Sequence, residues 1–164
     1  MSIDEKQFTH IDPQTGNPAM VDVSNKKVTH RTARARSIVV LGEEIMQKMS
    51  GDEIRTKKGP VFQTAIIAGT MAAKKTGDLI PLCHPLPIEN CRVEIHVNDK
   101  QEVVIDCTAV ITSKTGVEME ALTGASVAAL TIYDMCKAFS HDIVIRETKL
   151  MEKTGGKNDF KREA

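Results

Sequence analysis

Residues 115–138, TGVEMEALTGASVAALTIYDMCKA, predict a long helix built almost entirely from apolar and small residues. Charged side chains lie near its two ends, with Glu118 and Glu120 in the first turn and Asp134 and Lys137 near the last. Because residues three apart are neighbours on a helix surface, Asp134 and Lys137 share one face. Two interpretations follow. The pair is either an acid–base centre with pKa values shifted by apolar surroundings, or an exposed ion pair that contributes about 0.3–0.5 kcal/mol.

Four further segments are predicted to be strands. Apolar and polar side chains alternate along residues 28–41 and 91–98, which is the period of a strand with one buried face. Asn98, Asp99 and Lys100 form a predicted turn into the strand that follows. The predicted strands are residues 28–41, 91–98, 103–112 and 142–151.

A second helix is predicted to begin at Pro60, whose missing N–H is unpaired in a first turn anyway. Lys74 and Lys75 mark its end, with Gly77 just beyond. A short helix over residues 43–49 and a polar, basic loop over residues 50–59 precede it. The resulting order of strand, helix, strand, strand, helix, strand predicts a ferredoxin-like α+β fold, in which helices pack on one face of an antiparallel sheet.

The composition indicates one domain over residues 1–164, with a loose N-terminal segment at residues 1–20 and a polar tail at residues 155–164. Aromatic residues make up 3% of the chain and the net charge is zero, which argues against nucleic-acid binding. We expect no membrane association, because no apolar stretch is long enough to span a bilayer. The opening MSIDEK does not resemble a secretory signal, so we expect a cytoplasmic protein with reduced thiols.

Four groups of polar residues are candidates for chemistry, and each has a structural alternative. Arg31 to Arg36 could be a solvated strand face, and the Thr56–Gly59 segment a solvated loop or an anion site before a helix. Cys83 and His84 lie in the proline-braced loop DLIPLCHPLP (78–87), although most single histidines have no catalytic role. Thr115 and Glu118 have the spacing of a helix capping box. The cysteines and histidines lack zinc-ligand spacing, so no metal site is predicted.

These residues leave two classes of function open. An enzyme that acts on a phosphorylated small molecule fits the dispersed lysines and arginines, and so does a non-catalytic ligand-binding or assembly module. The chain contains no GxxxxGK[ST], GxGxxG, GxSxG or HExxH motif, which excludes the common sites that carry them.

Two long segments decide between these classes: KTGDLIPLCHPL (75–86) and KTGVEMEALTGASVAALTIYDMCKA (114–138). Together with MVDVS (20–24) and KTGGK (153–157), they resemble the molybdenum cofactor biosynthesis protein C family, the cyclic pyranopterin monophosphate synthases. The resemblance runs over nearly the whole chain. It implies that (8S)-3′,8-cyclo-7,8-dihydroguanosine 5′-triphosphate, made by a radical enzyme from GTP, is converted to cyclic pyranopterin monophosphate with release of pyrophosphate, an early step of molybdenum cofactor biosynthesis.

The resemblance also implies the site residues and the assembly. The family's catalytic residues match Asp134, Lys137 and Lys58. Its substrate-binding residues match Leu82, Cys83, His84, Glu118, Met119, Glu120, Arg31, Lys114 and Lys153. No cofactor is required by the sequence, and Mg²⁺ is expected only in company with the triphosphate. The implied assembly is a homohexamer, a trimer of dimers with active sites between subunits.

The helix geometry supports a shared site. Glu120 and Asp134 are 14 residues apart, which places them about 21 Å apart along the helix axis. One nucleotide-sized ligand cannot easily reach both within one subunit. The small residues of the helix are expected to let a partner approach closely; they are Ala121, Gly124, Ala125, Ala128 and Ala129.

Overall fold

A computed structural model of the chain describes residues 8–163. Residues 1–7 of the predicted loose segment and Ala164 of the predicted tail lie outside the described residues. The main sheet has five antiparallel strands in the order β5-β6-β1-β7-β8. Their bounds are β1 Thr29–Val40, β5 Asn90–Val97, β6 Val103–Ser113, β7 Val144–Thr154 and β8 Phe160–Lys161. Strands β1, β5, β6 and β7 confirm the four predicted strands, and β8 is a short addition from the segment that was predicted to be a polar tail.

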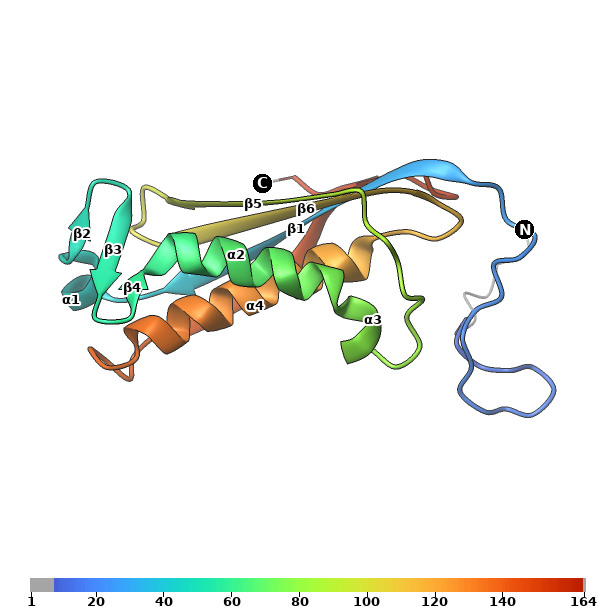
Figure 1. Cartoon of the computed structure of the whole chain (residues 1–164), viewed down its shortest axis with the longest axis horizontal. Helices are drawn as coiled ribbons and strands as arrows, with labels where there is room; N and C mark the ends of the chain where they lie inside the picture. The colour runs from blue at the N-terminus through green and yellow to red at the C-terminus, as the bar shows by residue number, and fades with distance from the viewer. Residues whose placement is uncertain (1–7, 164) are drawn as a thin grey trace.

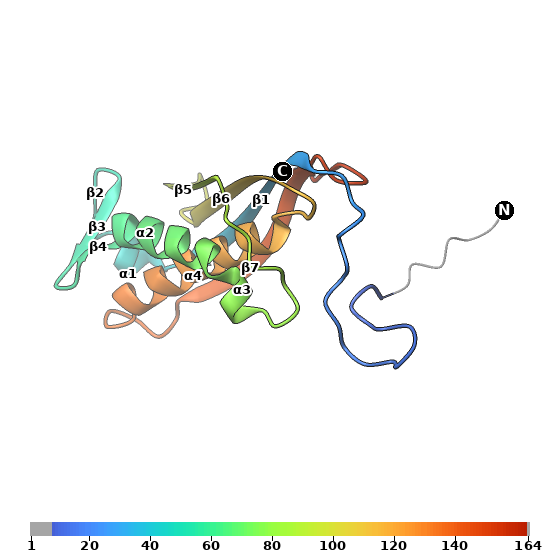
Figure 2. The same cartoon turned by 45° about the vertical axis from the view of Figure 1, so that its right-hand side comes forward.

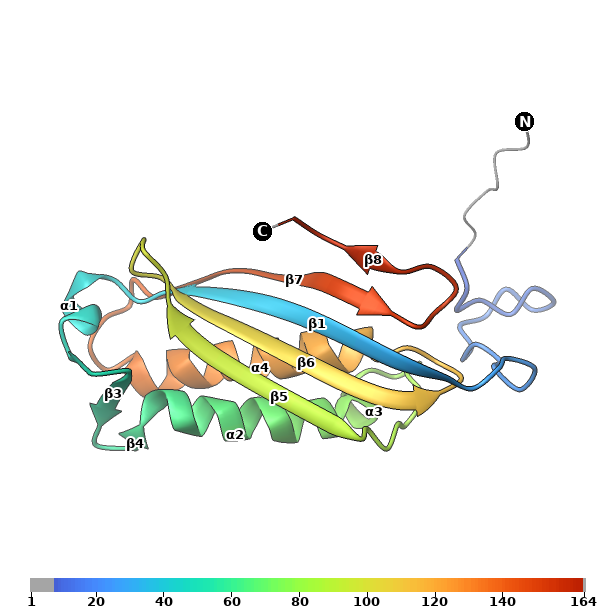
Figure 3. The same ribbon diagram turned by 90° about the horizontal axis from the view of Figure 1, so that it is seen from above.

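Two long helices, α2 (Val61–Lys74) and α4 (Glu118–Cys136), cover one face of this sheet (Figures 1 and 3). The element order and the strand order together confirm the predicted ferredoxin-like α+β fold. The alternation of each strand explains the layering, because the apolar residues of β1 and β6 turn toward the helices. Ala33, Ala35 and Ile105 are fully or almost fully buried on this face.

The small residues of α4 pack against other elements of the same chain. Ala121, Ala125 and Ala128 are completely buried, and α4 lies against both α2 and the sheet. A Cβ added at Gly69 of α2 would lie 2.8 Å from the carbonyl oxygen of Gly124, so both glycines permit the close approach of the helices. The expectation that this stripe receives a partner subunit is therefore wrong, because the stripe already packs within the subunit.

The segment between β1 and α2 differs from the prediction. Helix α1 (Glu43–Met46) is shorter than the predicted 43–49. The predicted basic loop forms a small three-stranded sheet instead, with β2 at Met49–Ser50, β3 at Glu53–Thr56 and β4 at Gly59–Pro60. Pro60 precedes α2 as its N-cap in an extended conformation and is not the first helical residue. The tight turn into β4 uses Gly59, whose φ of 113° lies in the region that favours glycine.

The N-terminus of α2 is capped by a carboxylate from β3. The backbone N–H groups of Phe62 and Gln63 donate to the Glu53 side chain at 2.8 and 3.1 Å. The anionic group inferred from the nearby lysines is therefore part of the protein at this helix end, and Lys58 points elsewhere.

We expect Glu53→Ala to lower the free energy of unfolding by about 1 kcal/mol, because two helix N–H groups lose their acceptor. Urea unfolding followed by circular dichroism measures this loss. Asp52→Ala is the matched control because its side chain is exposed in the neighbouring turn. Equal stability of the two variants would contradict the capping role.

Two further helix boundaries differ from the prediction. Gly77 does not end α2, because it lies inside a separate one-turn helix, α3 (Thr76–Leu79). Helix α4 has Val117 as its N-cap and no side-chain capping bond, so Thr115 and Glu118 do not form the predicted capping box. The Glu118 carboxylate instead accepts a hydrogen bond from Lys153 at 3.0 Å. Glu118 therefore forms an ion pair with Lys153 of β7 and does not cap its own helix.

Candidate active site

The first cluster of predicted site residues lies at the C-terminal end of α4. The Asp134 carboxylate binds two amines, with Lys137 Nζ at 2.9 Å from Oδ1 and Lys58 Nζ at 2.9 Å from Oδ2. Lys58 Nζ also donates to the backbone carbonyl of Asp134 at 3.3 Å. We call Lys58, Asp134 and Lys137 the lysine–aspartate cluster. The structure thus brings together the three residues that were predicted to be catalytic.

The β3–β4 turn carries Lys58 to this helix end (Figure 1). The backbone N–H of Lys58 donates to the Thr56 hydroxyl at 3.1 Å, which fixes the turn. The cluster borders a cavity of about 570 Å³, a size typical of small-molecule sites. Its lining residues are Thr56, Lys57, Lys58, Asp134, Met135, Lys137, Ala138 and Phe139.

The electrostatics of the cluster correct one expectation. Hydrogen bonds from Lys137 and Lys58 lower the pKa of Asp134 to about 2, and the hydrogen bond to Asp134 raises the pKa of Lys137. Both pKa values move away from neutrality because each group is hydrogen-bonded to an opposite charge. The side chains of Asp134 and Lys137 are 54% and 55% exposed, so burial does little to oppose these shifts. Within one chain the pair is an exposed ion pair with a third member. The alternative of a buried pair that titrates near neutral pH is wrong for the isolated subunit.

The second cluster lies at the other end of α4, where its first turn meets the proline-braced loop (Figure 1). Both predicted triplets, Leu82–His84 and Glu118–Glu120, line one pocket of about 170 Å³. Leu86, Thr115, Gly116 and His10 complete it; Thr115 and Gly116 belong to a segment that was a candidate for chemistry, whereas Leu86 and His10 were not predicted as site residues. We call this the α4 N-terminal pocket. Its volume is below the roughly 300–1,000 Å³ of typical ligand sites, so it fits only part of a nucleotide.

Glu120 is the carboxyl group whose burial matters most in this pocket. Only 3% of the residue is exposed, and burial raises the pKa of Glu120 to about 7. The group therefore exchanges protons near neutral pH, a property that the sequence suggested for Asp134. Burial also raises the pKa of the Cys83 thiol, so this cysteine is not an activated thiolate nucleophile.

The three remaining predicted residues lie at the same end of the molecule but do not line the pocket. Arg31 donates to the backbone carbonyls of Ser113 and Lys114, both at 3.1 Å. Lys114 Nζ donates to the Ser24 carbonyl at 2.8 Å, and Lys153 holds Glu118. In this chain they brace the segments around the pocket.

The other two arginines of β1, Arg34 and Arg36, lie on the face of the sheet that the helices do not cover. Arg34 and Arg36 both bind the Asp106 carboxylate on the neighbouring strand, with contacts of 2.9 Å each. Asp106 is 8% exposed, so the three side chains form a compact ion cluster. This region of β1 is neither a freely solvated face nor a free anion site.

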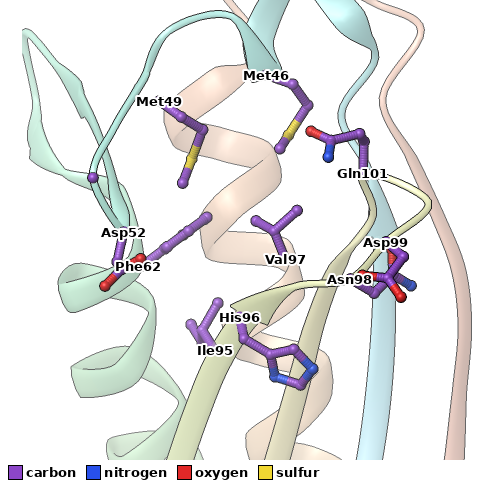
Figure 4. Close-up of a pocket in the computed structure, with 11 residues that line it drawn as sticks. Met46, Met49, Asp52, Phe62, Ile95, His96, Val97, Asn98, Asp99 and Gln101 are labelled. Atoms are coloured by element: carbon purple, nitrogen blue, oxygen red, sulfur yellow. The ribbon is translucent and has the colours of Figure 1, made fainter.

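A further cavity of about 730 Å³ shares no lining residue with either cluster. Met46, Met49, Phe62 and Val97 project toward this shared space between the small sheet, α2 and the end of β5 (Figure 4). None of the residues that line this cavity was predicted as a site residue.

Residues 8–163 show neither a metal site nor a membrane-spanning helix. No group of three or more His, Cys, Asp or Glu in this part of the chain is arranged to hold a metal ion. All four cysteines are free thiols, with the Sγ atoms of Cys91 and Cys107 at 3.8 Å. Among the described helices, none has the length and apolar character needed to cross a bilayer.

Comparison with known proteins identifies the family. A model described as the MoaC family matches residues 20–156, which include both clusters except for His10. The chain belongs to the MoaC family. It is similar to the cyclic pyranopterin monophosphate synthase of Xanthomonas campestris pv. campestris (strain 8004), with 54% identity over 154 residues that cover 94% of this chain and 93% of that protein.

Two longer relatives are similar to this chain over part of their length. The molybdenum cofactor biosynthesis bifunctional protein of Synechocystis sp. is 56% identical over 93% of this chain and 45% of its own length. Molybdenum cofactor biosynthesis protein 1 of Dictyostelium discoideum is 48% identical over 95% of this chain and 27% of its own length. The chain therefore spans less than half of these two proteins, and their other activities do not transfer to it.

Proposed function

We propose that this MoaC-family chain is a cyclic pyranopterin monophosphate synthase, a lyase of molybdenum cofactor biosynthesis. Its substrate would be (8S)-3′,8-cyclo-7,8-dihydroguanosine 5′-triphosphate, here called the cyclised GTP. The observation that carries the proposal is the assembly of the family-matched residues into two clusters, in a chain 54% identical to a protein of that name. The proposed unit is one domain over residues 1–164.

The α4 N-terminal pocket suits the heterocycle of the substrate. Its 2-aminopyrimidinone edge presents N–H donors, which a carboxylate binds well. Glu120 can accept these bonds and, with a pKa of about 7, can exchange a proton as the ring opens and closes again. His84 and Cys83 lie in the same wall. The two prolines around them hold this wall in place before substrate arrives.

The lysine–aspartate cluster suits the triphosphate and the reacting ring. Charge-assisted hydrogen bonds from Lys58 and Lys137 stabilise negative charge on phosphate and on developing oxyanions. Cyclic phosphate formation requires attack of a sugar hydroxyl oxygen on the α-phosphorus, and the bond to pyrophosphate breaks in the same step. Asp134 holds both amines in place, so that they stabilise the charge of the departing pyrophosphate, and the proton of the attacking hydroxyl is released to water.

A homohexamer, a trimer of dimers, would reconcile the two clusters. They lie at opposite ends of α4, about 21 Å apart along its axis, so a site shared between subunits would unite one end from each. Apolar side chains on the outer faces of the helices, Ile67, Met71 and Leu130, are 49–62% exposed and are candidates for subunit contacts.

The proposed cellular setting follows the same chemistry. The protein would act in the cytoplasm after a radical enzyme that cyclises GTP. No nucleic acid or membrane takes part, and Mg²⁺ would accompany the triphosphate as its counter-ion. No residue in the described part of the chain is assigned to hold that ion.

The alternative is a binding or scaffold module of the same family that has no activity. The presence of Lys58, Asp134 and Lys137 at contact distance favours the enzyme. An assay that mixes the purified chain with the radical enzyme, GTP and the reagents of that enzyme distinguishes the two functions. Cyclic pyranopterin monophosphate and pyrophosphate are expected in equal amounts. Accumulation of unconverted cyclised GTP would support the binding module.

We expect His84→Ala to lower turnover by about 10–100-fold, because the rigid loop then presents no imidazole to the substrate. The variant should fold normally, since His84 is only partly buried. Steady-state kinetics and circular dichroism test both points, with the exposed His96→Ala as the matched control. Stoichiometric zinc that is present in the wild type and lost in His84→Ala would show that the histidine is a metal ligand instead.

A further inference from the structure

One wall of the α4 N-terminal pocket comes from a segment that the proposed site does not use. His10 lines this pocket together with His84 and Glu118. It lies 19 residues before the start of β1 at Thr29, in a segment without a helix or a named strand among its described residues. His10 is also outside the part of the chain that the family model matches.

A closed turn holds His10 in this position. The His10 carbonyl accepts a hydrogen bond from the Ala19 N–H at 3.0 Å, so His10 lies at the base of the turn. Inside it, the Asp12 N–H donates to the Asn17 carbonyl at 2.9 Å, and the Asp12 carboxylate accepts from the Gln14 N–H at 2.7 Å. The turn therefore has a defined shape of its own.

The same segment is tied to the pocket at a second point. Lys114 Nζ donates to the Ser24 carbonyl at 2.8 Å. Lys114 directly precedes Thr115 and Gly116, which line the pocket. The chain from the turn to Ser24 is thus anchored beside the opening that His10 borders.

Outside these contacts the segment packs loosely. Phe8, Ile11 and Met20 are 88%, 47% and 46% exposed, and the segment stands out from the layered body (Figure 2). A segment with few buried contacts opens and closes at low free-energy cost. It can therefore move while the sheet and helices remain fixed.

We propose that His10 is a substrate-contacting residue and that residues 8–24 form a strap, which closes over the α4 N-terminal pocket when the substrate binds. This inference rests on the proposed function. The pocket of about 170 Å³ is small for a nucleotide, and a mobile wall lets the heterocycle enter and then be enclosed. The imidazole supplies a second hydrogen-bonding group beside Glu120. Because the strap contributes to binding, its loss changes affinity more than the chemical step.

The test compares wild type with His10→Ala, His10→Gln and Gln14→Ala. Gln14→Ala is the matched control, because the Gln14 side chain is exposed in the same turn. The kcat and KM are measured with the cyclised GTP. The Kd is measured for the same His10 and Gln14 variants in a Lys58→Ala background, which is expected to hold the substrate unconverted. We expect His10→Ala to raise KM and Kd about tenfold with kcat within about twofold, His10→Gln to restore part of the affinity, and Gln14→Ala to match wild type.

A second readout follows the strap itself. Lys26 and Lys27 are exposed, so we expect trypsin to cleave after them. The cyclised GTP should slow this cleavage in the Lys58→Ala protein but not when His10→Ala is added. Unchanged KM, Kd and protection in His10→Ala would overturn the strap, while the proposed function stands if wild type makes product. Absence of product from wild type would instead refute the proposed function, and the Kd and protection arms would still decide the strap.

Discussion

Asp134→Asn should lower turnover of the cyclised GTP by about 10²–10⁴-fold while the protein still folds and binds substrate. The amide keeps the shape of the side chain but removes the negative charge that orients Lys58 and Lys137. Both amines then lose a charge-assisted partner and their fixed positions. Steady-state kinetics measures the loss, and circular dichroism confirms the fold. The exposed Asp142→Asn, in the loop after α4, is the matched control.

Lys137→Ala should lower turnover by a comparable factor, because it removes one of the two amines that Asp134 binds. The double variant should lose much less than the product of the two single losses, because groups that act as a unit are not additive. Turnover close to wild type in Asp134→Asn, with folding and assembly confirmed, would remove the lysine–aspartate cluster from the mechanism.

The low pKa of Asp134 sets a further limit on its role. With a pKa of about 2, the carboxylate stays ionised throughout the working pH range of the free subunit. Its depressed pKa means that the ion pairs are present above the ordinary carboxyl pKa and are lost only as the pH falls toward 2. Asp134 is therefore best placed to position the lysines, whereas Glu120 has the pKa of a group that exchanges protons near pH 7.

The sequence predicted the order of the main elements because each carries a local signal. The alternation along residues 91–98 predicted β5, and the long run of small and apolar residues predicted α4 within three residues at each end. Helix spacing also predicted that Glu120 and Asp134 lie far apart, whereas the roles of the site residues came from the resemblance to the family. These predictions depend on the period of a helix or a strand, which the sequence displays directly.

The errors have a common physical cause, because each depends on contacts between distant residues. The capping of α2 by Glu53 and the pairing of Glu118 with Lys153 join separate elements and compete with local capping signals. Glu120 is buried and its pKa is raised, whereas Asp134 is exposed. The periodicity of the helix does not show which of the two carboxylates is buried. His10 has no local pattern that indicates a site, and only the path of the N-terminal segment brings it to the pocket.

Mixing two inactive variants should restore activity, because the proposed active site takes its halves from two subunits. Lys58→Ala disables the lysine–aspartate cluster, and His84→Ala combined with Glu120→Gln disables the α4 N-terminal pocket. When the two proteins are unfolded together and refolded as mixed oligomers, about one site in four should contain two intact halves. Activity should then reach about a quarter of the wild-type value, well above either variant alone.

This complementation is the most direct test of a single reaction centre assembled from both ends of α4. Light scattering on the mixed sample establishes that oligomers have formed, with about six subunits expected from the proposed hexamer. Each variant refolded alone is the control and should remain nearly inactive. Recovery to about a quarter of wild-type turnover is the predicted result. Mixed oligomers that stay at the level of the separate variants would contradict the shared site.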